Sequence, residues 1–359
     1  MDSFSATAKR MPALTARIAS NPSEFRVLTG ERPTGALHLG HYFGTIRERV
    51  RLQSIGVETI IILADYQVIT DRDIAENVGD HVRGAVADYL AAGLDPERTK
   101  IFTHSAVPAL NQLMLPFLSL VTESELHRNP TVKAELSASG RALSGLMLTY
   151  PVHQAADILF CKANLVPVGK DNLPHVEQSR VIARRFNERY RSVFPEPEAL
   201  ITDTPEILGL DGRKMSKSYG NAIALGMTED ETARAIRKTI TDSDKSISFD
   251  PVNRPGVSGL LSTAALCGDA SVEELVAELG DSGSGALKQR ATDAVNAYLA
   301  EHRRRRAEIV RDPGLVDSIL AAGNTWANGI AEGTLREVRD AMGMGYANSS
   351  EASRFSMRS

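Results

Sequence analysis

The stretch Thr59–Ala64 constrains the fold most, because its apolar, β-branched residues suit a strand that is buried on both faces. Shorter runs of the same kind, Phe25–Thr29 and Lys100–Thr103, predict strands before and after it. Helical patterns fill the intervals, from about Gly40 to Ser54 and from Ile74 to Ala92. Strands that alternate with helices form parallel sheets, so we predict an α/β fold with a doubly wound, Rossmann-like parallel sheet.

Two loops are expected at the edge of this sheet where ligands bind. In open parallel sheets the ligand lies beyond the carboxyl ends of the strands. The loops Thr29–His41 and Asp65–Thr70 both leave strands at that edge. No Gly-x-Gly-x-x-Gly sequence follows the first strand, so the fingerprint of a dinucleotide site is absent.

The length of 359 residues exceeds that of most single domains, which favours a larger unit with a smaller one appended. Capping-box spacings, Thr228 with Glu231 and Ser271 with Glu274, mark helices in the second half, where no strand pattern appears. We therefore predict a mobile N-terminal tail at 1–21, a Rossmann-like domain at 22–225, an all-helical domain at 226–346 and a mobile C-terminal tail at 347–359.

Composition excludes several classes of protein. The net charge of -4 argues against a protein that coats nucleic acid indiscriminately, although Arg303–Arg306 could form a local basic patch or a solvated helix face. No apolar run approaches the roughly 20 residues that span a bilayer, so we expect a cytoplasmic protein without a membrane partner. The two cysteines, Cys161 and Cys267, have no zinc-cluster spacing, so we expect reduced core thiols and no structural metal.

Two distant segments carry residues suited to a polyphosphate. His38 and His41 lie three apart where a loop enters a helix, so both imidazoles can face one site near exposed helix N–H groups. Lys214 and Lys217 lie three apart in a glycine-bordered loop that can close over phosphates. Taken singly, the histidines could be helix-start residues or half of a zinc site, and the lysines an ordinary basic turn. Their co-occurrence favours a single ATP site.

A helix near residues 145–160 can line a pocket. Tyr150, Gln154 and Asp157 follow one another at offsets of four and three, which places them on one face. The segment Val166–Gly169 reads as a short buried turn or strand, followed by a helix to about Tyr190. An aspartate satisfied by backbone groups is the structural alternative for Asp157.

The chain resembles the class I aminoacyl-tRNA synthetases, specifically their tryptophanyl and tyrosyl branch, whose signatures match His38-Leu39-Gly40-His41 and Lys214-Met215-Ser216-Lys217-Ser218. The resemblance extends from about Leu28 to Asn221 and more weakly to Met344. It implies that an amino acid carboxylate attacks the α-phosphate of ATP and that the aminoacyl group then passes to tRNA. It also implies Mg²⁺ on the phosphates and a homodimer with an anticodon-reading helical domain in each subunit.

The resemblance assigns roles residue by residue. His38 and His41 would donate hydrogen bonds to the phosphates in the transition state, and Lys214 and Lys217 would neutralise the departing pyrophosphate. Gly40 would let adenine approach the backbone, and Asp171 would bind the ribose. The expected ATP-binding residues are Arg32, Thr34, Gly40, Gly169, Asp171, Met215 and Ser216.

The resemblance favours L-tryptophan, with tRNA(Trp) as partner, over tyrosine. Asp157 would accept the indole N–H and Tyr150 would help hold the α-amino group, although tyrosyl enzymes use the same residue types at these offsets. Val27 and Leu28 offer no second hydrogen-bonding partner for a phenol hydroxyl, and an unpaired buried polar group costs about 1–3 kcal/mol. The expected substrate-binding residues are Leu28, Tyr150, Gln154, Asp157, Val166, Val168 and Asn172. A tyrosyl enzyme, a regulatory synthetase paralogue and a small nucleotidyltransferase are the alternatives.

Several residues depart from the family pattern. Gln154 stands where many tryptophanyl enzymes have Met, Gln67 where a His is frequent, and Asn172 where a longer Gln is usual. Arg32 replaces a frequent Gln, and Lys170 a common acidic residue. The changes resemble a divergent bacterial subgroup, from which we hypothesise altered pocket selectivity.

Overall fold

Five parallel strands form the sheet of the computed structural model, in the order β3-β2-β1-β4-β5. The structure describes residues 3–70, 77–130, 132–133, 143–169, 172–201 and 207–346. The strands are β1 (Arg26–Glu31), β2 (Glu58–Leu63), β3 (Thr99–Thr103), β4 (Leu165–Val168) and β5 (Glu198–Ile201). The predicted doubly wound parallel sheet is confirmed, and the segment at Val166 is a strand.

Helices cover both faces of the sheet, and β2 shows why. Its isoleucines alternate between two cores: Ile60 and Ile62 pack with helix α9 (Gly145–Leu159), whereas Ile61 packs with α4 (Val78–Ala91). Because both faces are covered, the strand is apolar along most of its length. The other helices of this region are α2 (Leu39–His41), the π-helical turn Tyr42–Ile46, α3 (Arg47–Ser54), α5 (Pro108–Gln112), α6 (Met114–Leu118), α7 (Glu123–Arg128) and α10 (Leu173–Arg189).

The predicted helices are present with small differences in their bounds. The expected helix from Gly40 to Ser54 is continuous but passes through a π turn. Helix α4 ends at Ala91, and Gly93 then adopts a positive φ of 105°, which glycine accommodates readily. Residues 74–76, where this helix was expected to begin, lie outside the described residues.

The strand order places a crevice between β1 and β4. The chain runs outward from β1 to β2 and β3, and the other strands lie on the opposite side of β1. This reversal is the switch point at which open α/β sheets bind ligands. The loop after β1 contains both predicted histidines, so the topology positions them at this crevice.

The prediction of a mobile N-terminal tail is wrong for residues 3–20, which form helix α1 (Ser3–Ser20). Leu14 and Ile18 lie four residues apart on one face and are buried with Phe25 and Leu200. Arg17 also pairs with Glu198 of β5 at 3.1 Å. The predicted C-terminal tail, 347–359, lies outside the described residues.

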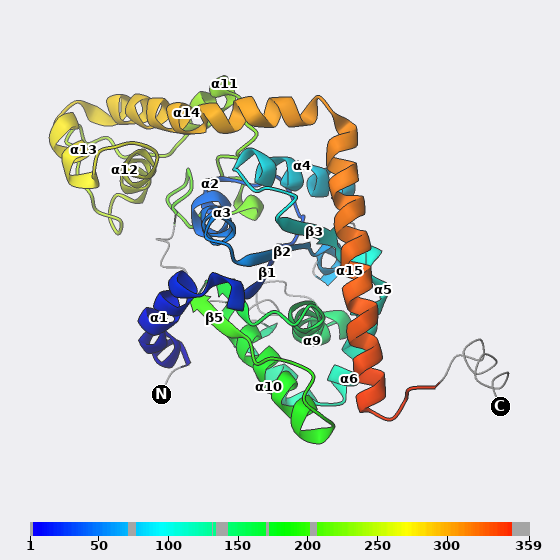
Figure 1. The fold of residues 1–359 in the computed structure, drawn as a ribbon. Helices are drawn as coiled ribbons and strands as arrows, with labels where there is room; N and C mark the ends of the chain where they lie inside the picture. The colour runs from blue at the N-terminus through cyan, green and yellow to red at the C-terminus, as the bar shows by residue number, and fades with distance from the viewer. Residues whose placement is uncertain are drawn as a thin grey trace, which may run out of the picture.

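The second half of the described chain is helical, as predicted, but it is not a separate unit. Its helices are α11 (Glu229–Arg237), α12 (Pro255–Cys267), α13 (Val272–Leu279), α14 (Gly283–Val310) and α15 (Pro313–Ala341). Figure 1 shows α14 lying across α4 and α15 running along the side of the sheet.

Helix α15 shares the core of the Rossmann-like unit, although it lies within the predicted helical domain at 226–346. Ala327, Ala331 and Leu335 are buried in the same cluster as Phe102 of β3. Asn324 accepts a hydrogen bond from the backbone N–H of Thr103 at 3.0 Å, so α15 covers the edge strand of the sheet. No helix within the described ranges is long and apolar enough to cross a membrane, and both cysteines are free and buried.

Candidate active site

His38 and His41 form a reciprocal cap at the start of α2. The backbone N–H of Gly40 donates to Nδ1 of His38 at 3.1 Å, and the backbone N–H of His38 donates to Nδ1 of His41 at 3.2 Å. Since both Nδ1 atoms accept, a neutral ring must carry its proton on Nε2. A Cβ atom on Gly40 would lie 2.9 Å from the His38 ring, which explains a glycine between the histidines.

Both imidazoles are neutral at pH 7. Burial, with the positive charge of Lys217 and the neighbouring ring, lowers the pKa of His38 to about 3. Burial also lowers the pKa of His41 to about 4, against the opposing influence of the Glu31 carboxylate. The two rings therefore act as Nε2–H donors rather than as cations.

The lysine loop is joined to the histidine turn by backbone pairing. Leu39 donates its N–H to the carbonyl of Ile223 at 3.0 Å, and Leu225 donates to Leu37 at 2.9 Å. Met215 is buried, and its Cβ lies 3.7 Å from the position of a Cβ on Gly40. The fold thus brings the two segments together, as a single site would require.

The charge of Lys217 reaches both residues of the histidine turn. The Cδ atom of Lys217 is 3.4 Å from where a Cβ on Gly35 would lie, whereas the Lys214 side chain is exposed. Asn221, which was not predicted, holds the loop: its Oδ1 accepts from the N–H of Ser216 at 2.8 Å, and its Nδ2 donates to Asp211 at 2.6 Å.

A buried ion pair supports the floor of this site, and neither of its members was predicted from the sequence. Glu31 ends β1, and Arg49 of α3 donates to it at 3.0 Å. Burial alone would raise the pKa of Glu31. The nearby Arg49, His41 and Lys217 nevertheless hold this pKa below its usual range. The sequence signal that could have indicated this ion pair is a Glu at the carboxyl end of a central strand.

The depressed pKa values of the histidines predict that the protein loses stability in acid. An unfolded chain protonates these residues near pH 6.5, whereas the folded rings accept protons only at about 3 and 4. Between these values the unfolded chain binds more protons, so the free energy of unfolding falls as pH drops from about 6.5 toward 4. Urea unfolding at pH 5 and pH 7 should show a smaller pH difference for the double variant His38→Gln/His41→Gln. An identical pH difference in both proteins would contradict this assignment.

The residues predicted to bind the amino acid lie along α9. Tyr150 and Asp157 are buried, Gln154 is half-buried, and the Tyr150 hydroxyl lies 3.3 Å from Nε2 of His175, a buried residue of α10. Opposite this helix, Leu28, Val166 and Val168 are buried members of the adjoining core. The structure therefore brings the predicted polar face and apolar wall to the same part of the fold.

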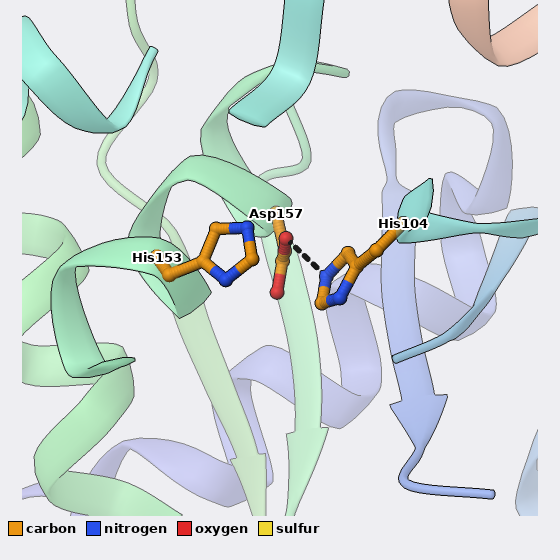
Figure 2. Close-up of side chains that lie close together, drawn as sticks. All are labelled: His104, His153 and Asp157. Carbon is orange, nitrogen blue, oxygen red and sulfur yellow. Dashed lines mark hydrogen bonds and ion pairs between the residues drawn. The ribbon is translucent and has the colours of Figure 1, made fainter. Parts of the chain in front are cut away.

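Asp157 has side-chain partners that the sequence did not predict. Its Oδ1 lies 2.7 Å from Nε2 of His104, and its Oδ2 lies 3.4 Å from Nε2 of Gln67. His153 lies beside them (Figure 2), and the centroid of its ring is 4.5 Å from the centroid of the His104 ring. Among the described residues, the hydrogen-bond partners of Asp157 are the side chains of His104 and Gln67 and not the backbone groups of the structural alternative. Both histidines and the aspartate are also spaced closely enough to hold a metal ion.

The remaining predicted ligands differ in exposure. Thr34 and Gly169 are half-buried, whereas Arg32 and Asn172 are exposed. Asn172 is the N-cap of α10 without a side-chain capping bond. Asp171, the predicted ribose ligand, lies outside the described residues, as does Lys170.

The run Arg303–Arg306 is not a free basic patch. Arg303 donates to the carbonyl of Met227 at 2.8 Å, and Arg306 pairs with buried Asp88 at 2.7 Å. Arg304 and Arg305 pair with Glu301 on the same helix. Arg303 therefore holds α14 against the segment that follows the lysine loop, and Arg306 holds α14 against α4.

Comparisons with known proteins agree with this geometry. The family model "tRNA synthetases class I (W and Y)" matches residues 20–300. A tryptophan–tRNA ligase of Clostridium longisporum is 40% identical over 333 residues, covering 90% of this chain and 98% of the relative. The crystal structure of tryptophanyl-tRNA synthetase from Campylobacter jejuni with ADP and tryptophan has a TM-score of 0.77 and 31% identity, covering 89% of this chain and 99% of the other.

Proposed function

This chain belongs to the class I tRNA synthetases of the tryptophan and tyrosine branch, and from that premise we propose how its residues ligate tryptophan to tRNA. The enzyme is an ATP-dependent tryptophan–tRNA ligase. ATP and L-tryptophan give tryptophanyl-adenylate and pyrophosphate, and a hydroxyl of the terminal adenosine of tRNA(Trp) then takes the tryptophanyl group and releases AMP.

The observation that carries the nucleotide assignment is the fixed pair of Nε2–H donors, which lie close enough to Lys217 for its charge to lower the pKa of both rings. The tryptophan carboxylate is anionic at pH 7, so its attack on the α-phosphorus needs no general base. It needs positioning and stabilisation of the charge that develops on the phosphates. His38 and His41 supply neutral donors whose orientation is set by backbone bonds, and Lys217 supplies positive charge above Gly35.

Two lysines then neutralise the departing pyrophosphate, with Mg²⁺ entering as part of the MgATP substrate. The Lys217 side chain lies beside Gly35 in the loop that leads to the histidine turn, and Lys214 can approach from the exposed side of the lysine loop. Arg32, Thr34, Gly40, Gly169, Asp171, Met215 and Ser216 are the proposed ATP contacts.

Asp157 selects the amino acid by accepting the indole N–H. It is 2% exposed, and an acceptor at the end of an apolar pocket matches a ring that offers one donor. Tyr150 and Gln154 line the same helix face, and Leu28, Val166 and Val168 form the apolar wall. Asn172, although exposed, is proposed to contact the substrate from the start of α10.

The helices from 226 to 346 are proposed to carry the anticodon contacts of tRNA(Trp). The intramolecular contacts of Arg303 and Arg306 mean that other side chains must meet the tRNA. The homodimer and the cytoplasmic location remain predictions from the family resemblance.

Tryptophan-dependent exchange of pyrophosphate into ATP tests this function. We expect exchange to be at least about 100-fold faster with tryptophan than with tyrosine, because Asp157 alone cannot satisfy a phenol hydroxyl in an apolar pocket. Aminoacylation of purified tRNA should follow with the same preference. Exchange with tyrosine alone would move the chain to the tyrosyl branch, and absence of both activities would favour a regulatory paralogue.

A further inference from the structure

We propose that His104 is a positioning residue for tryptophan recognition: it fixes one oxygen of Asp157 so that the other oxygen accepts the indole N–H. This inference rests on the proposed role of Asp157 in substrate binding. It concerns a residue that directly follows strand β3, whereas Asp157 lies on helix α9, and that acts on the substrate only through Asp157.

The two carboxylate oxygens of Asp157 are held very differently. Oδ1 lies 2.7 Å from Nε2 of His104, which is a strong bond between buried groups. Oδ2 lies 3.4 Å from the Gln67 amide, near the limit of a hydrogen bond. A substrate N–H can therefore replace the Gln67 contact at Oδ2 without disturbing Oδ1.

The ring of His104 is itself rigidly placed. It is 0% exposed, lies at the carboxyl end of β3, and packs against the rings of Tyr66 and His153. Asn111 donates to the His104 carbonyl at 2.9 Å, which anchors the backbone. Asp157 sits on another element, α9, so the His104 bond limits the rotation that an aspartate carboxylate otherwise has.

The other ring nitrogen indicates that this placement serves Asp157. Nδ1 of His104 is buried without a hydrogen-bond partner among the described residues. Burying an unpaired polar atom is unfavourable, so a structural role alone would favour an apolar side chain here. The Nε2–H bond to Asp157 is the contact that an apolar residue could not make.

His153 provides an internal comparison within the same cluster. Nδ2 of Asn111 donates to two backbone carbonyls, so its Oδ1 faces His153 and accepts from Nε2 of that ring at 2.7 Å. Figure 2 shows both rings beside Asp157, with the hydrogen bond drawn only to His104. Of the two, His104 is thus the one bonded to the carboxylate.

The test compares tryptophan with 3-benzothienylalanine, in which sulfur replaces the indole N–H and the ring shape is kept. The glutamine amide nitrogen reaches the position of Nε2, whereas that of asparagine reaches only the position of Nδ1. We expect His104→Asn to reduce the preference for tryptophan over the analogue, measured as kcat/KM in pyrophosphate exchange, by about 10-fold. The loss should appear in the KM for tryptophan, and His104→Gln should restore most of the preference.

The matched control is His153→Asn, which alters a buried histidine of the same cluster and should leave the preference unchanged. Equal losses with both substrates in His104→Asn would overturn the inference. A second result would also overturn it: Zn²⁺ alone raises the melting temperature of the wild type but does not raise that of His104→Asn. That result would indicate a metal site at this cluster.

Asp157→Asn separates this inference from the function on which it rests. If Asp157→Asn abolishes the preference while His104→Asn keeps it, the positioning role fails and the proposed recognition stands. If neither wild type nor Asp157→Asn discriminates between the substrates, the proposed role of Asp157 fails, and the positioning role of His104 fails with it.

Discussion

Replacing Lys217 by alanine is expected to slow adenylate formation by on the order of 100-fold, while the affinity for tryptophan changes little. Lys217 lies over Gly35, and its charge reaches His38, His41 and Glu31. The phosphates gain charge in the transition state, whereas the residues proposed to bind the amino acid lie along α9 and not in this loop. Single-turnover adenylate formation and equilibrium tryptophan binding measure the two effects separately.

Lys214→Ala and Lys245→Ala are the variants with which Lys217→Ala is compared. Lys214 has an exposed side chain, so its removal should slow the step less than removal of Lys217. Lys245 is exposed in the loop between α11 and α12, and its loss should leave the rate unchanged. A Lys217→Ala variant that weakens tryptophan binding without slowing adenylate formation would contradict the role given to the loop.

The sheet could be predicted because its strands are long or apolar enough to stand out. Thr59–Ala64 has no plausible place other than a buried strand, and the helix after it ends at Ala91, two residues before Gly93. Strand β5, Glu198–Ile201, is short and follows a proline-rich stretch, so no periodicity marked it. Helix α1 was missed because two apolar residues, Leu14 and Ile18, carry its packing among many small and polar ones.

Only those residues of the site that lie in local sequence motifs could be predicted. The histidine turn and the lysine loop each have a recognisable spacing, and their chemistry requires them to meet. Contacts made by single residues from separate elements have no such signal. His104 reaches Asp157 across 53 positions, and Arg49 reaches back to Glu31 from the next helix. Only the fold brings these partners together.

Arg49 is the residue on which the stability of this site depends most. Its side chain is 1% exposed, and all of its nitrogens donate. The acceptors are Thr29 Oγ1, the Tyr89 hydroxyl, the Gly30 carbonyl and Glu31 Oε1. Removal of the guanidinium would leave a largely buried carboxylate and a buried phenol without their arginine donor.

Arg49→Met is therefore expected to lower the free energy of unfolding by about 3–5 kcal/mol, measured by urea denaturation. Arg51→Met is the matched control on the same helix, because Arg51 pairs with Glu48 at 2.6 Å on the surface and such pairs contribute about 0–1 kcal/mol. Adding Glu31→Gln to Arg49→Met should recover part of the loss, since an amide is easier to bury than a carboxylate. If the two arginine variants lost equal stability, the buried ion pair would not be what holds the end of β1 against α3.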